Sequence, residues 1–325
     1  MAKCKFNAKK GLLAALLLLF GSLLFCESEE EFKKRILSNA DLSGESAAEI
    51  MAEDDGVDKG AGLSAGQKRL PSTFPRDVPY TKEAVAFYEA HYDHKIMNDI
   101  VRKSYYYASI DAANALPDEY SKLISLARAD YYYGLSVMES FDLTSLDKID
   151  LGDSGSSTNI NDRAGEYFDK AIAECNDALK IRKGSDAYST LAQAISMNCT
   201  AKNVAYVLAN GLKVRANAKK AVALDYSNGL GQFMVIAQDS YAPWPFCKLK
   251  SSRKALLRVL DDQYIRIERC DAQMIYAAIG YTFYKQKKWD KAIEWYNKIF
   301  ELYPQNYTAR QMIRKIADRK AGKKN

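Results

Sequence analysis

The sequence predicts an all-α protein, and three observations support this prediction. Apolar residues recur at helical spacing along most of the chain beyond residue 80, and Pro117 is the one proline between residues 80 and 242. No stretch shows the alternation of Val, Ile and Thr between hairpin turns that is typical of strands. A content of 48% hydrophobic and 27% charged residues is ordinary for a globular protein and excludes a collagen or a wholly disordered chain.

The first 26 residues have the pattern of a secretory signal. Four lysines and no acidic residue occupy positions 1 to 10, and a run of small or apolar residues follows from Gly11 to Phe25. This run of 15 residues is shorter than the roughly 20 that a helix needs to span a bilayer. We therefore expect residues 1–26 to be a signal peptide and the protein to be exported, either to the periplasm or to a membrane anchor.

The end of this segment leaves two interpretations open. Leu23, Leu24, Phe25 and Cys26 resemble the lipobox of bacterial lipoproteins, which implies lipidation of Cys26 and attachment to a membrane. Phe25 departs from the lipobox, in which Gly, Ala or Ser precedes the cysteine. The alternative is ordinary cleavage after Ser28, which releases the mature chain.

Residues 27–80 are expected to form a flexible linker. Residues 27–58 contain 11 acidic against three basic residues, and residues 55–76 add four glycines and two prolines. Such a composition does not bury enough apolar surface to offset the entropy of ordering the chain. The linker is either a spacer that holds the following domain away from a membrane or a leader without a role of its own.

The remaining chain, residues 81–325, is expected to be one helical domain. Its first helix should start after the N-cap Thr81, continue to residue 115 and end before Pro117. A second helix is expected at 119–141, followed by a loop rich in Gly, Ser and Asp at 142–158. Later helices are expected at 161–181, 186–198, 204–224, 230–241, 252–260, 272–286, 289–303 and 308–317.

Residues 273–304 resemble a tetratricopeptide repeat. Small residues stand where the two helices of such a repeat cross, and a proline ends the second helix. Ile299 departs from the pattern, which has Ala at that position. The matching residues are Tyr276, Ile279, Gly280, Phe283, Ala292, Tyr296 and Pro304.

Weaker similarities extend this pattern to about four degenerate repeats. Expected helix ends at Ile181, Leu224, Leu260 and Leu302 are separated by 43, 36 and 42 residues, against about 34 in an ideal repeat. The segment 308–317 follows them as a capping helix. The resemblance implies a superhelix of helical hairpins that binds a polypeptide partner in a concave groove.

The resemblance also implies which residues line that groove. In tetratricopeptide repeats these are side chains of the first helix of each hairpin. Trp244, in the stiff loop of residues 243–246, is either a rim contact or a plug on the core. Carried over to this chain, the groove positions are Ala277, Tyr281, Tyr284 and Lys285, with Phe233, Ala237, Ser240 and Tyr241 in the preceding hairpin.

A second resemblance covers about fifty residues. The stretch 221–246, with 254–260 after it, is similar to the T component, a helical lipoprotein that accompanies tripartite periplasmic (TRAP) transporters. Phe246, Cys247 and Lys248 stand where that family often has Gly-Gly-Asp. The resemblance implies an alternative function, in which the protein binds a periplasmic solute-binding protein or a small ligand.

Charge and motif content limit the other function classes. The formal net charge is +6, and without residues 1–26 the balance is 43 basic against 41 acidic residues, which gives no support to nucleic acid binding. No nucleophile elbow, phosphate-binding loop or His-Glu-x-x-His motif occurs. His91 and His94 have acidic neighbours but lack a third ligand at a fixed spacing. We therefore expect a protein that is not an enzyme and that has no cofactor, no metal site and no nucleic acid partner.

Three further features each have two interpretations. Tyrosine triplets at 105–107 and 131–133 either pack between helices or line the groove. The C-terminal residues 308–325, with seven basic residues and one acid, are either a solvated end or a contact for anionic lipid or an acidic partner. Four cysteines either form two disulfides, in one of three pairings, or are buried thiols. They are Cys175, Cys199, Cys247 and Cys270.

Overall fold

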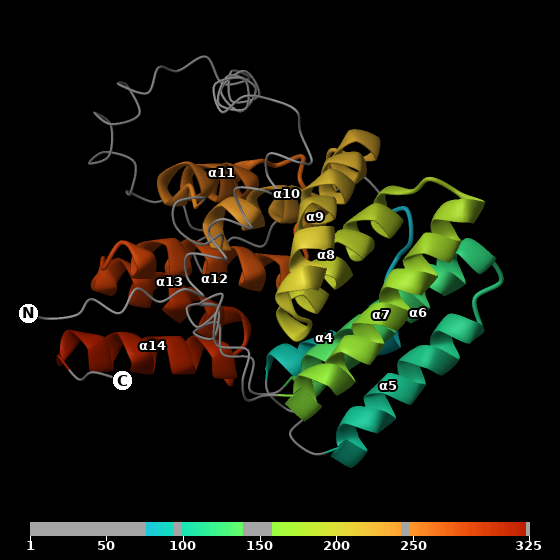
Figure 1. Ribbon diagram of the computed structural model, residues 1–325, viewed down its shortest axis with the longest axis horizontal. Coiled ribbons are helices and arrows are strands. Elements are labelled where there is room, and N and C mark those ends of the chain that lie inside the picture. Colours follow the sequence, from blue (N-terminus) through green and yellow to red (C-terminus); the bar gives the residue numbers. More distant parts are fainter. Residues whose placement is uncertain (1–75, 94–98, 139–157, 242–246, 323–325) are drawn as a thin grey trace, which may run out of the picture. The chain divides into compact units, whose positions relative to one another are not determined.

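The amphipathic segments of the sequence form α-helices throughout the described part of the chain (Figure 1). The computed structural model describes residues 76–93, 99–138, 158–241 and 247–322, and these residues contain no strand, only an isolated bridge between Asn228 and Arg266. The predicted all-α class is confirmed. The helices are α4 (Lys82–Tyr92), α5 (Asp99–Asn114), α6 (Glu119–Val137), α7 (Thr158–Ile181), α8 (Ser185–Ala201), α9 (Val204–Leu224), α10 (Gly229–Tyr241), α11 (Leu249–Asp261), α12 (Arg269–Lys285), α13 (Trp289–Leu302) and α14 (Tyr307–Lys320).

Helices α6 to α13 form four consecutive hairpins, α6 with α7, α8 with α9, α10 with α11, and α12 with α13. Their second helices end at Ile181, Leu224, Asp261 and Leu302, within one residue of the expected ends. Helix α14 packs on α13 as the expected cap, and Figure 1 shows α12 and α13 between α11 above them and α14 below. The described residues thus have the helical-repeat fold that the sequence predicts.

The close approach of α12 and α13 explains the small residues of the repeat. A Cβ atom on Gly280 would lie 3.0 Å from Cε2 of Tyr296, so a larger residue would push the two helices apart. Ala292 is fully buried at the same crossing. The two helices approach closely because the Tyr296 ring of α13 packs directly on the backbone of α12 at Gly280, which has no side chain.

The predicted helix over residues 81–115 is wrong, because two helices occupy this stretch. Thr81 caps α4 as expected, since its side chain accepts a hydrogen bond from the Ala84 N–H, but α4 ends at Tyr92. Helix α5 begins at Asp99 and packs on α4, where the Phe87 ring of α4 stacks on the Tyr105 ring of α5 at 6.2 Å. No proline or glycine marks the end of α4 in the sequence, and the helical spacing of apolar residues continues past it. The sequence therefore predicts one helix in place of two.

Residues 76–80, which the linker prediction includes, pack onto the helices. The Arg76 side chain is 6% exposed, and its guanidinium lies 3.3 Å from Oδ1 of Asp186 in α8 and 3.0 Å from Oε1 of Glu268, the N-cap of α12. These ion pairs connect the starts of two helices that belong to different hairpins. The pair of Arg76 with Asp186 is buried on both sides, and such a pair is strongly destabilised by the loss of either partner.

Asp186 is the centre of this network. Its carboxylate accepts a hydrogen bond of 2.7 Å from the Val78 N–H and lies 3.4 Å from the Arg128 guanidinium of α6. Arg128 in turn donates to the Val78 carbonyl at 2.7 Å. The guanidinium groups of Arg76 and Arg128 lie 4.8 and 4.2 Å from the centre of the Tyr80 ring. The segment 76–80 therefore links α6, α8 and α12.

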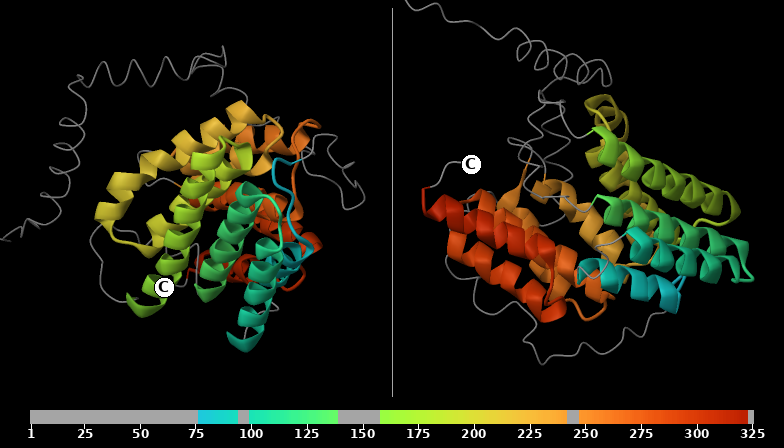
Figure 2. Two further views of the ribbon diagram at one scale, coloured as in Figure 1. Left: turned by 90° about the vertical axis from the view of Figure 1, so that its right-hand side faces the viewer. Right: turned by 90° about the horizontal axis from the view of Figure 1, so that it is seen from below.

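Helix α4 also contacts the C-terminal hairpin. The Tyr303 hydroxyl donates to Oε1 of Glu89 at 3.0 Å, and the Asn306 side-chain amide donates to the Tyr92 carbonyl at 2.9 Å. The Gln305 N–H adds a bond of 3.0 Å to Oδ1 of Asp93. Figure 2 shows α4, in blue, between the green helices and the orange and red ones. The first described helix is thus tied to the segment that joins α13 and α14.

All described residues belong to one of the two compact units into which the chain divides, residues 62–148 with 155–325. The expected signal peptide, Cys26 and most of the expected linker lie outside the described residues, as does the end of the expected helix 119–141. Within the described ranges, no helix has the length and hydropathy to cross a bilayer.

Candidate functional site

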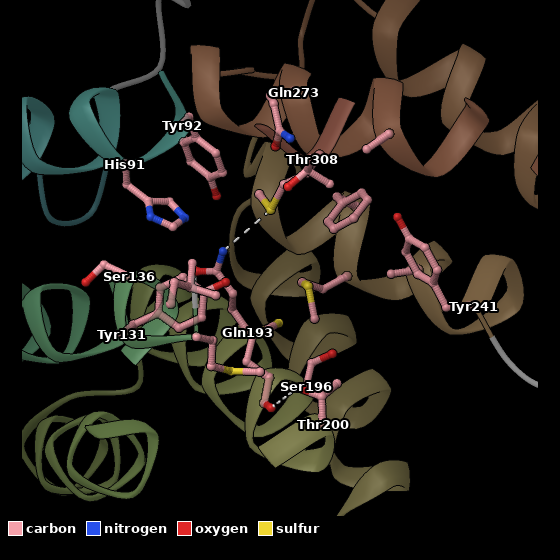
Figure 3. Close-up of a pocket in the computed structure, with 18 of the residues that line it drawn as sticks. His91, Tyr92, Tyr131, Ser136, Gln193, Ser196, Thr200, Tyr241, Gln273 and Thr308 are labelled. Carbon is pink, nitrogen blue, oxygen red and sulfur yellow. Dashed lines mark hydrogen bonds between the residues drawn. The ribbon is translucent and has the colours of Figure 1, made fainter. Parts of the chain in front are cut away.

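The first helices of the four hairpins, together with α4 and the start of α14, surround a cavity of about 240 Å³ (Figure 3). We call it the central cavity. Every second helix of the described chain contributes to it. Its lining residues are His91 and Tyr92 of α4; Tyr131, Leu135 and Ser136 of α6, with Met138 after it; Gln193, Ser196, Met197 and Thr200 of α8; Phe233, Met234, Ala237 and Tyr241 of α10; Gln273, Met274 and Ala277 of α12; and Asn306, Tyr307 and Thr308 at α14.

Helical periodicity brings these side chains to one place. On α8 the lining residues are Gln193, Ser196, Met197 and Thr200, at spacings of three, four and seven, which lie on one face of a helix. Figure 3 shows His91 and Tyr92 pointing into the cavity from α4, with Gln193 facing them from α8. The lining of the cavity thus consists of small groups of residues from six different segments of the chain.

The cavity lining is rich in sulfur and aromatic rings. Four methionines line it, and the Gln193 amide donates to the Met274 sulfur at 3.7 Å. Its lining residues, all within the described ranges, include no Asp, Glu, Lys or Arg. Burial raises the pKa values of Tyr92, Tyr131 and Tyr241, so their hydroxyl groups stay protonated at neutral pH. Such a site suits an apolar group with one or two hydrogen-bonding atoms.

The size of the cavity limits what it holds. A volume of about 240 Å³ is below the roughly 300 to 1,000 Å³ of pockets for drug-sized ligands. It accommodates one large side chain or a small organic molecule, and it is too small for a helix or a folded segment. Methionine side chains adapt to differently shaped groups because they are unbranched and polarisable.

Four of the expected groove residues line the central cavity. They are Phe233, Ala237, Tyr241 and Ala277. Ser240, on the same helix as the first three, is fully buried and does not contribute to the lining. Trp244 lies outside the described residues.

Tyr281 and Tyr284 lie elsewhere, although they follow Ala277 on the same helix. Their side chains are 1% and 2% exposed, and their rings pack in a row with Tyr241. Neighbouring helices cover them: Arg319 of α14 lies 5.1 Å from the centre of the Tyr284 ring. Lys285 is exposed, with its ammonium 5.6 Å from the centre of the Tyr281 ring. Of the groove positions predicted on α12, Ala277 lines the cavity, whereas α10 and α14 cover Tyr281 and Tyr284.

Both interpretations of the tyrosine triplet at 131–133 hold for different members. Tyr131 lines the central cavity, whereas Tyr132 packs 5.6 Å from the Tyr88 ring and Tyr133 packs 4.4 Å from the Tyr167 ring. Consecutive residues on a helix point about 100° apart, so one triplet serves three neighbours.

Apart from Tyr131, the lining residues on α4, α6, α8 and α14 are absent from the groove that the sequence predicts. The predicted helix 186–198 contains Gln193, Ser196 and Met197, and their helical spacing is a usable signal. For α4 no such signal exists, because its place at the cavity depends on contacts between residues more than 200 positions apart, such as Tyr92 with Asn306.

Metal and disulfide chemistry have no support in the described ranges. No group of three or more His, Cys, Asp or Glu side chains there is arranged to hold a metal ion, and His94 lies outside them. Cys175, Cys199, Cys247 and Cys270 are all free thiols; Cys175 and Cys270 are buried, as the second interpretation of these cysteines has it, whereas Cys199 and Cys247 are partly exposed. Burial raises the pKa of Cys199 to about 11 and raises those of Cys175 and Cys270 as well, so these three thiols are unreactive at neutral pH.

Comparison with known proteins adds one finding. No curated protein matches this chain. Residues 274–306 match the family model of the tetratricopeptide repeat, which covers α12 from Met274 onward, α13 and the turn that follows. The matched segment contains Ala277, which lines the central cavity, and Gly280 at the helix crossing. The hairpin α12–α13 therefore matches the tetratricopeptide repeat, a module that generally serves as a non-catalytic scaffold for protein interactions.

Proposed function

We propose that this protein is an exported adaptor that binds a polypeptide partner, and that the central cavity takes up one apolar or aromatic side chain of that partner. The observation that carries the proposal is the cavity of about 240 Å³ on the inward faces of the repeat helices, whose described lining residues include no Asp, Glu, Lys or Arg. Buried pockets that accept a single large side chain commonly supply most of the binding energy of an interface.

Export is the second part of the proposal. It is supported by the lysine-rich start and the apolar run of residues 11–25. We place the protein in the periplasm, either free or anchored through a lipid on Cys26. Incorporation of radiolabelled palmitate that is lost in Cys26→Ser would support the anchor, and equal incorporation in the variant would contradict it.

The adaptor hypothesis is tested by filling the cavity. In Ala237→Leu/Ala277→Leu, six added carbon atoms occupy the space that the partner's side chain needs. We expect crosslinking in the native cell, followed by mass spectrometry, to identify a protein that the parent chain captures and that the variant captures at least tenfold less. Ala223→Leu on the exposed face of α9 is the matched control and should capture as the parent does.

The circular dichroism spectra of the variants establish that the helices are retained. Unchanged capture by a folded, cavity-filled variant would contradict the adaptor hypothesis.

A second candidate is a transporter-associated component that binds a solute-binding protein or a small ligand. Two observations favour it: the resemblance of residues 221–246 to the T component of TRAP transporters, and a cavity whose volume fits a small molecule. Native mass spectrometry of the purified chain distinguishes the two candidates. A retained small molecule that Ala237→Leu/Ala277→Leu loses, with no captured polypeptide, would replace the adaptor hypothesis by this one.

A further inference from the structure

A second hollow lies on a different part of the helices, between α7, α8 and α9. We call it the lysine groove. It has a volume of about 670 Å³ and shares no lining residue with the central cavity. Helix α8 packs against both α7 and α9. The buried side chains Tyr188, Leu191 and Ile195 of α8 form the floor of the groove, and α7 and α9 form its two walls.

The α9 wall is a regular stripe of side chains. Its members recur mostly at spacings of three and four residues, which keeps them on one face of the helix. The stripe spans 14 residues, which is about 21 Å or four helical turns. The groove is therefore elongated along α9. The residues of the stripe are Tyr206, Asn210, Lys213, Ala216, Asn217 and Lys220.

The groove is large enough for one face of a helix but not for a whole helix. A helix of 21 Å in length and 10–12 Å in width with its side chains occupies roughly 2,000 Å³. The groove has about 670 Å³, a third of this volume. A helical occupant therefore inserts the side chains of one face and leaves its opposite face outside.

A helix also suits these walls better than an extended peptide does. The walls are themselves helices, whose backbone N–H and C=O groups are largely bonded within each helix. An extended peptide finds few backbone partners on such a surface, whereas a helix satisfies its own. The Asn210 side chain, in the middle of the α9 wall, is also bonded already, to the Tyr206 carbonyl and to Lys213.

Lysines stand on both sides of the apolar floor. Lys180 and Lys183 line the groove from the side of α7, and Lys213 and Lys220 line it from α9. None of the lining residues, all in the described part of the chain, is acidic, and the 21 residues of α9 include no Asp or Glu. A hollow lined by one sign of charge attracts the opposite sign.

Three of these lysines have no carboxylate partner among the described residues. Lys180 pairs with Asp177 at 2.6 Å. Lys213 donates to the Asn210 side-chain oxygen at 2.9 Å, the Lys220 ammonium lies 5.2 Å from the centre of the Tyr188 ring, and Lys183 is exposed. The rim therefore carries an excess of positive charge above an apolar floor.

We propose that the lysine groove binds an acidic amphipathic helix of a partner polypeptide. Apolar side chains at every third or fourth position of that helix pack on the α8 floor, and the carboxylates beside them pair with the lysines of both walls. Exposed ion pairs each contribute little, so the floor supplies most of the affinity and the lysines select an acidic partner. The proposal does not depend on the function proposed for the central cavity.

A synthetic helix tests the proposal. The probe is a fluorescein-labelled peptide of about 14 residues, with leucine at the first, fourth, eighth and eleventh positions, glutamate on both sides of this stripe and alanine elsewhere. We expect fluorescence anisotropy to show saturable binding to the full chain that weakens severalfold in 0.5 M NaCl. A peptide of the same composition in shuffled order, without the stripe, should bind at least tenfold more weakly. Equal binding of the two peptides would overturn the proposal.

Charge reversal at the rim locates the bound peptide. Lys183→Glu/Lys220→Glu should weaken binding of the probe at least tenfold. Lys219→Glu/Lys287→Glu is the matched control, because it makes the same change of net charge at two exposed lysines that do not line the groove, and it should leave binding within twofold. Circular dichroism establishes that all variants are folded. Equal loss in the two double variants would contradict docking in the groove.

The cavity-filled variant separates this proposal from the function proposed above. Ala237→Leu/Ala277→Leu should bind the probe as the parent does, since neither residue lines the lysine groove. Loss of the probe in this variant would assign the peptide to the central cavity and overturn the proposal.

Carbodiimide crosslinking of the probe to the parent chain, with mass spectrometry, provides a measurement that needs no substitution. We expect the glutamates of the probe to react with lysines of both walls, Lys183 on one side and Lys213 or Lys220 on the other. Crosslinks to one wall alone would place the peptide outside the groove and contradict the proposal. Binding of phosphatidylglycerol vesicles through Lys183 and Lys220, with no binding of the probe, would make a membrane surface the occupant instead.

Discussion

Two carboxyl groups lie close together between α5, α6 and α7. Asp130 of α6 is buried and accepts a hydrogen bond of 2.8 Å from the Tyr106 hydroxyl of α5. Burial, followed by the adjacent Asp130 carboxylate, raises the pKa of Glu174 on α7 to about 9. Two like charges in a dry site are not ionised together, so this pair retains a proton at neutral pH.

This pair predicts how Glu174→Gln changes stability with pH. The folded chain holds a proton that the unfolded chain releases above a pH of about 4.5, so the pair makes the free energy of unfolding fall as pH rises from there to about 9. The glutamine is neutral in both states and removes this dependence. We expect the free energy of unfolding of Glu174→Gln to be higher than that of the parent by about 1–3 kcal/mol at pH 8, and to differ little from it at pH 5.

Urea unfolding at pH 5, 6.5 and 8 measures this difference. Glu166→Gln, an exposed change on the same helix, should shift the free energy of unfolding by less than about 0.5 kcal/mol at each pH. A difference between parent and Glu174→Gln that stays constant over this range would contradict a shared proton.

Single residues are where the sequence predicts least. Arg76 belongs to a stretch with Gly and Pro and has the appearance of a solvated linker residue, yet it pairs with Asp186, 110 positions away. Asp186 itself stands at the start of an expected helix, where an acid usually faces water and complements the helix dipole. Which residues pair with a buried charge depends on how several hairpins pack together. Local sequence patterns do not predict this packing.

At the scale of helices and hairpins, local sequence patterns predict most of the observed elements. Periodicity and the repeat spacing place α7 to α14 within a few residues of their observed bounds. The same pattern identifies Phe233, Ala237, Tyr241 and Ala277, four lining residues of the central cavity, because they belong to first helices of the best-defined repeats. The prediction failed at α4 and α5 because neither Pro nor Gly stands between them to mark the end of the first helix.

The crossing of α12 and α13 predicts a large effect of a small change. In Gly280→Ala the added methyl group meets the Tyr296 ring at 3.0 Å, so the helices must shift or the ring must move. We expect a loss of about 1–3 kcal/mol in the free energy of unfolding, measured in urea.

Gly211→Ala is the matched control for this substitution. Gly211 also lies inside a helix, α9, but a Cβ atom there meets only Cγ1 of Val207 at 4.0 Å. Alanine should stabilise this helix by roughly 0.5–1 kcal/mol, because it restricts the unfolded backbone more than glycine does. If both substitutions raised the free energy of unfolding, helix propensity and not the helix crossing would determine the effect at Gly280.

At the scale of the whole described unit, the contacts of α4 with the α13–α14 turn join the two ends of the repeat array. The Asn306 amide donates to the Tyr92 carbonyl, while its side-chain oxygen accepts from the Ala309 N–H at 2.9 Å and caps α14. One side chain thus serves a local cap and a contact across more than 200 residues.

Asn306→Asp separates these two roles. Aspartate is as good an N-cap as asparagine, but its carboxylate cannot donate to the Tyr92 carbonyl and is repelled by it. We expect the free energy of unfolding to fall by about 1–3 kcal/mol and amide hydrogen exchange to accelerate in both α4 and α14. Faster exchange confined to α14 would show that α4 is held without this contact.

Tandem repeats ordinarily gain or lose whole copies with little penalty, because each copy touches only its neighbours. The hydrogen bonds from Tyr303 and Asn306 to α4 remove that freedom here. An extra hairpin inserted anywhere between α5 and α13 would carry the two bonded surfaces apart and open the central cavity. Divergence of this protein should therefore proceed by exchange of the side chains that line the cavity, with the number of hairpins unchanged.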